Sequence, residues 1–319
     1  FLGIANNLDS ESRLFKAFGI FLVVGTGIAA STILIMELPD FKLPFLSNFY
    51  SHHPNLWSGK IQPNYVGGSL TFFFPAVLWA LIGGYPKRIW TGMAVVLTGF
   101  GLLMTQSRSA LLGIGIVSVL TMAFWHRCVC YALLGLVVIA GLLVYLLGFA
   151  GFLDPGIGYE VDRNLESRQK LWESAVYISQ DFAFTGIGLR SFPLVVDLLY
   201  PLILIGPNAR VPHPHNLYLD VVASLGFPGF VAFWALLGAW GGMLWEILKR
   251  CRGNPELRYF EVCGLGLASG MGANLVYSVT DAITLGEKAG VVFWGVLGLT
   301  AALWRIVRIR QTVEESASR

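Results

Sequence analysis

The segment "VPHPHNLYLD", residues 211–220, holds two of the five histidines of the chain beside two prolines. The prolines fix the backbone and favour a helix that begins near Asn216. His215 would then be held at the start of that helix. Because histidine exchanges protons near neutral pH, a histidine fixed there suits a general base, although it could equally be a structural side chain that hydrogen-bonds a loop. His213 lies two residues earlier and would point elsewhere on a helix, so we expect it to be the weaker candidate.

Two further polar residues are candidates to support this histidine. Asp281, in "SVTDAITLG", lies where an apolar run ends, and its carboxylate could orient a histidine or an arginine or could cap a helix. Asn216 follows the candidate base directly. A zinc site built from His213, His215 and Asp220 matches no common ligand spacing, so we expect no metal and no cofactor.

Several basic residues could bind an anion. Arg108, in "TQSRSALLG", is expected at the N-terminus of a helix, where free backbone N–H groups and a guanidinium together suit a phosphate. The alternative is an arginine that extends to the membrane interface. Arg168 and Lys170 could add cationic clamps or could form a solvated helix face. Arg190 and Arg210, which flank a second apolar run, are equally open.

The chain that carries these residues is mostly apolar. Of its 319 residues, 55% are hydrophobic and 13% are charged, and the mean hydropathy is +0.66, which indicates an integral membrane protein. The net charge of +3 is a sum over two membrane faces and implies no nucleic-acid partner. The apolar runs are continuous rather than alternating, which favours an all-α transmembrane bundle over a barrel. We predict eight spans, at residues 14–37, 67–85, 89–106, 109–126, 129–152, 226–248, 260–281 and 289–307.

Basic residues set the expected orientation. The short loops "YPKR", "WHR" and "KRCRGNPELR" are rich in Lys and Arg, which predicts that they face the cytoplasm. We therefore divide the chain into five N-terminal spans (1–152), a periplasmic catalytic loop (153–225) and three C-terminal spans with a cytoplasmic tail (226–319). Because the sequence starts with Phe, we also expect further helices upstream.

The long outer loop has helical character of its own. In "NLESRQKLWESAVYIS", residues 164–179, apolar positions recur at helical spacing with charges between them, which predicts an amphipathic helix over the outer mouth of the bundle. The run "VVDLLYPLILIGP", residues 195–207, is too short to span, and we expect it to lie on the membrane surface. Gly226 and Gly229 predict a bend at the start of the sixth span.

Taken together, these motifs resemble a known family. The pair His215–Asn216, the string "GFPG" at 226–229, "QSRSALLG" and "ESRQKLWESA" resemble the O-antigen ligase family. Its superfamily also contains O-antigen polymerases and bacterial protein O-oligosaccharyltransferases. The resemblance runs from about Asn64 through the last span. Phe230 departs from it, because ligases commonly have Thr after the second glycine, and this keeps the polymerase open.

The resemblance implies a metal-independent, inverting glycosyltransferase of the bacterial inner membrane, active in lipopolysaccharide biosynthesis at the periplasmic face. Such an enzyme moves a glycan from undecaprenyl diphosphate to an acceptor hydroxyl, on lipid A core oligosaccharide for a ligase or on another glycan or a protein for its relatives. By resemblance, Arg108 and Arg168 hold the diphosphate, His215 is the general base, and Asp281 matches an acidic residue of the last outer turn. A flippase for the lipid-linked glycan is the rival of another class, and the gathering of charged residues on one face argues against it.

Overall fold

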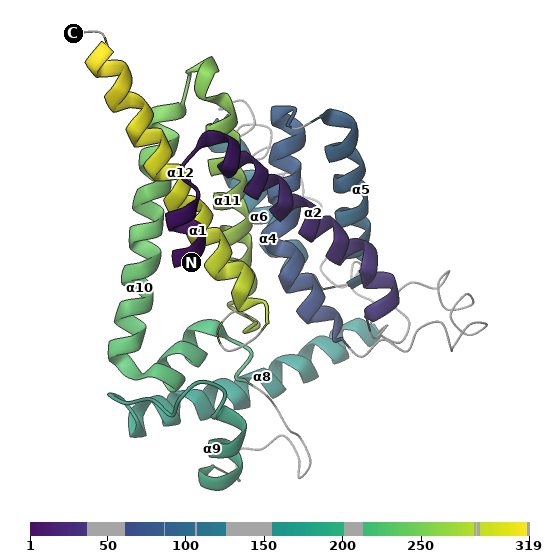
Figure 1. Ribbon diagram of the computed structural model, residues 1–319. Helices are drawn as coiled ribbons and strands as arrows, with labels where there is room; N and C mark the ends of the chain where they lie inside the picture. The colour runs from purple at the N-terminus through teal and green to yellow at the C-terminus, as the bar shows by residue number, and fades with distance from the viewer. Residues whose placement is uncertain are drawn as a thin grey trace. The chain divides into compact units, whose positions relative to one another are not determined.

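The computed structural model describes residues 1–36, 61–85, 87–105, 107–125, 155–200, 213–283, 285 and 288–317. Within these residues the secondary structure is helical, apart from a single bridge between Met36 and Ile61 (Figure 1). The predicted all-α class is therefore confirmed for the described part of the chain.

Six of the described helices are long and apolar enough to cross a membrane. They are α2 (Glu11–Ile35), α4 (Pro63–Gly83), α5 (Arg88–Thr105), α6 (Arg108–Trp125), α10 (Leu217–Cys251) and α12 (Gly290–Ala317). The predicted span at 129–152 lies outside the described residues. The predicted span at 260–281 corresponds to a helix, α11 (Arg258–Tyr277), which is not among the six.

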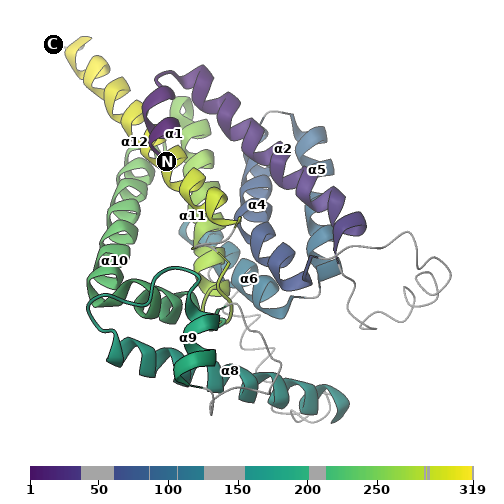
Figure 2. The ribbon, with the colours of Figure 1, turned by 60° about the horizontal axis from the view of Figure 1, so that its bottom comes forward.

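Polar side chains buried in contacts with α4 distinguish α11. Ser269 and Asn274 are fully buried on this helix. The Trp79 indole donates to the Ser269 hydroxyl over 2.9 Å, and the Asn274 amide donates to the Gly68 carbonyl over 3.1 Å. The two helices run side by side in Figures 1 and 2. Because its polar groups are paired within the protein, α11 can be buried although it is less apolar than the six candidate spans.

The chain forms two compact units. The first comprises residues 1–115, 234–277 and 287–319 and contains α1 (Leu2–Asn7), α2, α4, α5, α11, α12 and the short 3-10 helix Pro255–Leu257. The second comprises residues 116–233 and 278–286 and contains α8 (Pro155–Asp181), α9 (Phe192–Leu199) and the first turns of α10. The division at residues 152 and 225 follows the expected membrane topology and stays a prediction.

An apolar core joins the helices of the second unit. Leu171, Ala175 and Ile178 of α8 pack against residues of α9 and against Ala223 of α10. The helix predicted at residues 164–179 is thus confirmed as part of α8, and its spacing of three and four residues forms the buried stripe. From α9, Phe192 and Val196 face this core.

The run predicted to lie on the membrane surface is described only in part. Its first residues belong to α9, where Leu194, Leu198 and Leu199 are exposed. Residues 201–212 lie outside the described part of the chain. A position on the membrane surface therefore stays a prediction.

The helix α10 is kinked at Gly226, whose φ of 68° and ψ of −178° are non-helical. Glycine adopts a positive φ at little cost, whereas other residues are strained there. Pro228 follows in the first turn after the kink, where its missing N–H leaves no helical hydrogen bond unmade. The predicted bend at the start of this span is confirmed at Gly226, whereas Gly229 has an ordinary helical backbone.

Backbone contacts fasten the kink to the turn between α8 and α9. We call this contact the glycine clasp, because Gly186 of the turn and Gly226 of α10 meet in it. A Cβ on Gly186 would lie 2.4 Å from the Ser224 carbonyl oxygen, and one on Gly226 would lie 2.6 Å from the Phe184 oxygen. Three backbone hydrogen bonds hold the clasp: Ile187 N–H to Ala223 O, Gly188 N–H to Ser224 O and Phe227 N–H to Ala183 O. The clasp therefore fixes the first turns of α10 against α8.

Candidate functional site

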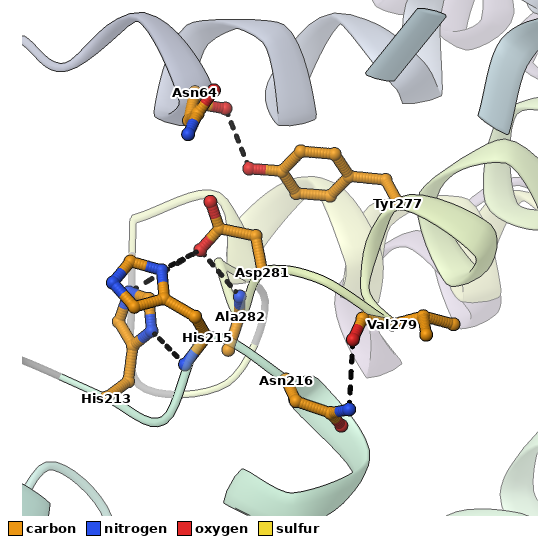
Figure 3. Close-up of polar contacts among 8 residues, drawn as sticks. All are labelled: Asn64, His213, His215, Asn216, Tyr277, Val279, Asp281 and Ala282. Carbon is orange, nitrogen blue, oxygen red and sulfur yellow. Dashed lines mark hydrogen bonds and ion pairs between the residues drawn. The ribbon is translucent and has the colours of Figure 1, made fainter. Parts of the chain in front are cut away.

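Asn216 connects the start of α10 to the chain segment that follows α11 (Figure 3). Its side-chain oxygen accepts from the backbone N–H groups of Tyr218 and Leu219 at 2.9 and 3.1 Å, which is the geometry of a helix cap. Its side-chain amide donates to the Val279 carbonyl at 2.9 Å. One side chain thus starts the helix and holds the segment that carries Asp281 beside it.

Every N–H group in the first turn of α10 has an acceptor. Leu217 N–H donates to the Ser278 carbonyl at 2.9 Å, and Asp220 N–H donates to the Asn216 carbonyl at 2.9 Å. The two N–H groups between them are bound by the Asn216 side chain. This helix terminus positions side chains rather than binding an anion, because free N–H groups are what make a helix terminus an anion site.

His215 and Asp281 form a hydrogen-bonded pair within the second unit, as Figure 3 shows. The His215 Nδ1 lies 3.0 Å from Asp281 Oδ1, and the same oxygen accepts the Ala282 backbone N–H at 2.9 Å. Burial raises the pKa of Asp281, but hydrogen bonds and the neighbouring imidazoles outweigh it and hold the pKa below its ordinary value. The ionised carboxylate can only accept, so Nδ1 of His215 carries a proton, and in the neutral imidazole Nε2 is the nitrogen with the free lone pair.

The backbone of His215 has a φ of 51°, in the left-handed region that side chains other than glycine rarely adopt. Its N–H group donates to Nδ1 of His213 at 3.2 Å, and the two imidazole rings meet edge to face with centroids 4.5 Å apart. His213 is only 14% exposed. Burial and the neighbouring His215 lower the pKa of His213 to about 4, against the smaller opposing effect of Asp281. His213 is therefore neutral at pH 7.

The expectation that His213 points away from His215 was wrong. It assumed that both residues belong to a helix, whereas α10 begins only at Leu217. The left-handed backbone of His215 reverses the chain and brings the two rings together. The relative orientation of the two rings depends on the φ angle of His215, which residue spacing in the sequence cannot predict.

The zinc ligands considered from the sequence were His213, His215 and Asp220. These three side chains do not come together in the structure. Asp220 is buried in α10, 3.4 Å from the Ser224 hydroxyl. The carboxylate beside the two histidines is that of Asp281, and possible ligand atoms of His213, His215 and Asp281 lie within 4.8 Å of one another. Since Nδ1 of His213 accepts an N–H, its Nε2 carries the proton. A metal at that nitrogen would displace the proton and break the bond to the His215 backbone, which makes this trio a poor metal site.

The candidate arginines are placed on two helices. Arg108 is the first residue of α6, as predicted, and is exposed in the first unit. Arg168 is half-buried on α8 in the second unit. Neither has a hydrogen bond or ion pair with the residues that the structure describes, so both guanidinium groups are available to a ligand.

The structure says less about the other three basic candidates. Lys170 is exposed on α8, and Arg190 is exposed in the α8–α9 turn with a φ of 64°. Arg210 lies outside the described residues.

One polar group of α8 was missed by the sequence analysis. The indole N–H of Trp172 is buried without an acceptor among the described residues. Trp172 follows Arg168 by one helical turn, so the two side chains lie on the same flank of α8. The spacing in "ESRQKLWESA" was a usable signal, because residues four apart share a helix face.

The family model described as O-antigen ligase matches residues 93–234. This part of the chain is an O-antigen ligase domain. No curated protein matches the chain. The domain indicates a membrane glycosyltransferase of the O-antigen ligase and polymerase family, and the six candidate spans make the chain an integral membrane protein.

The O-antigen ligase domain contains most of the residues considered above, but it ends before Asp281. Arg108, Arg168, His213 and His215 lie within the matched residues. Asp281 follows 66 residues after His215 and joins the group through the fold. The structure therefore extends the candidate site beyond the part that the family model covers.

Proposed function

We propose that this protein is an O-antigen ligase-like glycosyltransferase. It moves a glycan from undecaprenyl diphosphate to an acceptor hydroxyl of lipid A core oligosaccharide, at the periplasmic face of the bacterial inner membrane. The observation that carries the proposal is the His215–Asp281 pair, which belongs to the same compact unit as most of the O-antigen ligase domain.

His215 is the general base. Its Nε2 takes the proton of the acceptor hydroxyl, while Asp281 holds Nδ1 and stabilises the imidazolium that forms. His215 is 26% exposed and so remains accessible to a substrate, whereas Asp281 is 5% exposed. The two roles follow from burial, because the buried carboxylate orients the ring and the partly exposed ring can meet the substrate.

The transfer is a single displacement at the anomeric carbon. The acceptor oxygen forms the new bond as the bond from that carbon to the diphosphate oxygen breaks, which inverts the anomeric configuration. The proton stays on His215, and undecaprenyl diphosphate leaves with the bonding electrons. Arg108 and Arg168 neutralise the charge that builds on the leaving oxygens. Their lack of partners among the described residues supports this role.

The remaining polar residues support this chemistry. Asn216 positions the base through the helix cap, and Lys170 and Arg190 add positive charge near α8 and α9. We expect no metal to take part, because a metal at Nε2 of His213 would move the proton to Nδ1 and break its bond with the His215 N–H. Activity should therefore persist in EDTA, and loss of transfer on chelation that Zn²⁺ or Mg²⁺ restores would overturn this step.

An acceptor panel tests the proposal. Purified protein in EDTA receives undecaprenyl-diphosphate glycan together with lipid A core, a second lipid-linked glycan or a protein acceptor. A ligase forms the lipid A conjugate, a polymerase lengthens the lipid-linked chain, and a protein O-oligosaccharyltransferase modifies the protein. Phe230, which departs from the ligase pattern, makes the polymerase the second candidate. Movement of the donor across proteoliposomes without transfer to any acceptor would show a flippase instead.

A further inference from the structure

The His213 imidazole packs against the backbone of His215, and this contact has a function of its own. We propose that His213 is a positioning residue, whose Nδ1 holds His215 in the left-handed conformation that directs its imidazole to Asp281. The proposal rests on the role of His215 as the base. The proposed role of His213 involves no contact with substrate.

The conformation of His215 needs support from its surroundings. A left-handed backbone at a residue other than glycine costs free energy and persists only where neighbouring contacts hold it. On the C-terminal side, Asn216 is fixed by its cap and by its bond to Val279. On the N-terminal side, the bond from the His215 N–H to His213 Nδ1 at 3.2 Å is the contact that holds the turn.

The two nitrogens of His213 have different surroundings. Nδ1 accepts the backbone N–H, which can only donate, so Nδ1 is unprotonated. Nε2 lies 3.9 Å from Asp281 Oδ1, which is too long for a hydrogen bond. Among the described residues, the titratable groups that face this ring are the His215 imidazole and the Asp281 carboxylate. The geometry thus indicates that His213 holds His215 through Nδ1 rather than through Nε2.

Substitution of His213 by residues with amide side chains can distinguish the roles of its two ring nitrogens. The oxygen of asparagine reaches the position of Nδ1, and asparagine commonly accepts the N–H of the second residue after it. The longer side chain of glutamine places its amide near the position of Nε2 instead. His213→Asn therefore retains the proposed contact, whereas His213→Gln and His213→Leu remove it.

The test compares the three variants in glycan transfer. We expect His213→Asn to keep kcat within about threefold of the wild type, and His213→Gln and His213→Leu to lose on the order of 10²-fold in kcat, as misplacement of a catalytic group does. KM for the donor should change little, because His213 does not contact it. Equal losses in the Asn and Gln variants would overturn the proposal.

A second readout does not depend on activity. ¹⁵N-histidine NMR spectra of the purified proteins report which nitrogen of His215 carries the proton. We expect the Nδ1–H form in the wild type and in His213→Asn, and a mixture of both forms in His213→Gln and His213→Leu. An unchanged His215 signal in all three variants would contradict the role of His213. If the wild type transfers no glycan, the proposed function fails, and these spectra still decide whether His213 positions His215.

Discussion

Asp281 decides which nitrogen of His215 is free. As an ionised acceptor it binds the Nδ1–H, so that in the neutral imidazole Nε2 is the nitrogen that can take up a proton. Asp281→Asn would present an amide that can donate to Nδ1 and so shift the proton to Nε2. We expect kcat to fall on the order of 10²- to 10⁴-fold. Asp197→Asn, an exposed position on α9, is the matched control and should leave kcat unchanged. Similar rates for the Asp281 variant and the wild type would remove the orienting role of Asp281.

The largely buried His213 makes the fold sensitive to acid. Its pKa is about 4 in the folded protein against 6.5 ordinarily, so the unfolded chain takes up a proton first as the pH falls. Stability should drop between pH 6.5 and 4, by about 3 kcal/mol from this group. The Asp281 pKa is lowered, so its contribution is intact above pH 4 and is lost only below that.

Melting curves at pH 7 and pH 5 measure this difference. The wild type should lose stability between the two values, and His213→Asn should lose less because its side chain does not titrate. A pH 5 loss of the same size in both proteins would assign the acid sensitivity to another group.

At the scale of elements, the glycine clasp sets the position of α10 against α8. Gly186→Ala and Gly226→Ala each place a Cβ within 2.6 Å of backbone atoms and strain a positive φ. We expect either change to lower the free energy of unfolding by about 2–4 kcal/mol, because the backbone atoms on both sides of the clasp are held by hydrogen bonds and cannot shift to make room. Gly238→Ala in the same helix meets no atom within 4 Å and is the control. Equal melting temperatures for all three would show that the clasp is not rigid.

The α8 helix carries Arg168 on the flank that it shares with Trp172. If Arg168 binds the diphosphate, Arg168→Ala should lower kcat/KM for the donor on the order of 10²-fold, and Arg168→Lys should lose less, since it keeps the charge but not the paired donors. Gln169→Ala, on the exposed face, should be neutral. The measurement is transfer at varied donor concentration, and wild-type kcat/KM in the Ala variant would exclude this role.

The helices could largely be predicted from the sequence, because apolar runs act locally. The runs that became α2, α4, α5, α6 and α12 each form one helix. For α10 the predicted span starts near the kink, while the helix itself begins earlier, at Leu217. The amphipathic stripe of α8 was equally visible. The polar contacts of α11 with α4 depend on a partner distant in sequence, and hydropathy alone cannot show them.

The candidate site could be predicted only in its parts. His215 and Arg108 stood out by type and by their place at helix starts. The pairing of His215 with Asp281 joins positions 66 residues apart, and the orientation of His213 depends on one positive φ. Both arise from tertiary structure, so local patterns could name the residues but not their arrangement.

At the scale of the whole molecule, the orientation in the membrane is the prediction to test. Single cysteines at Gln180 on α8 and at Thr312 on α12, in a variant without the natural cysteines, report the two sides. We expect Gln180→Cys to react with an impermeant maleimide in spheroplasts, and Thr312→Cys to react only after permeabilisation. The reverse pattern would place the histidine group in the cytoplasm and overturn the periplasmic assignment.

The central claim is that His215 acts as the base in glycan transfer without a metal. The most direct measurement is a single-turnover transfer from undecaprenyl-diphosphate glycan to lipid A core, in EDTA, by the wild type, His215→Ala and the exposed control Gln180→Ala. We expect transfer by the wild type and the control, and loss of transfer in His215→Ala with donor binding retained. Transfer by His215→Ala at the wild-type rate would contradict it.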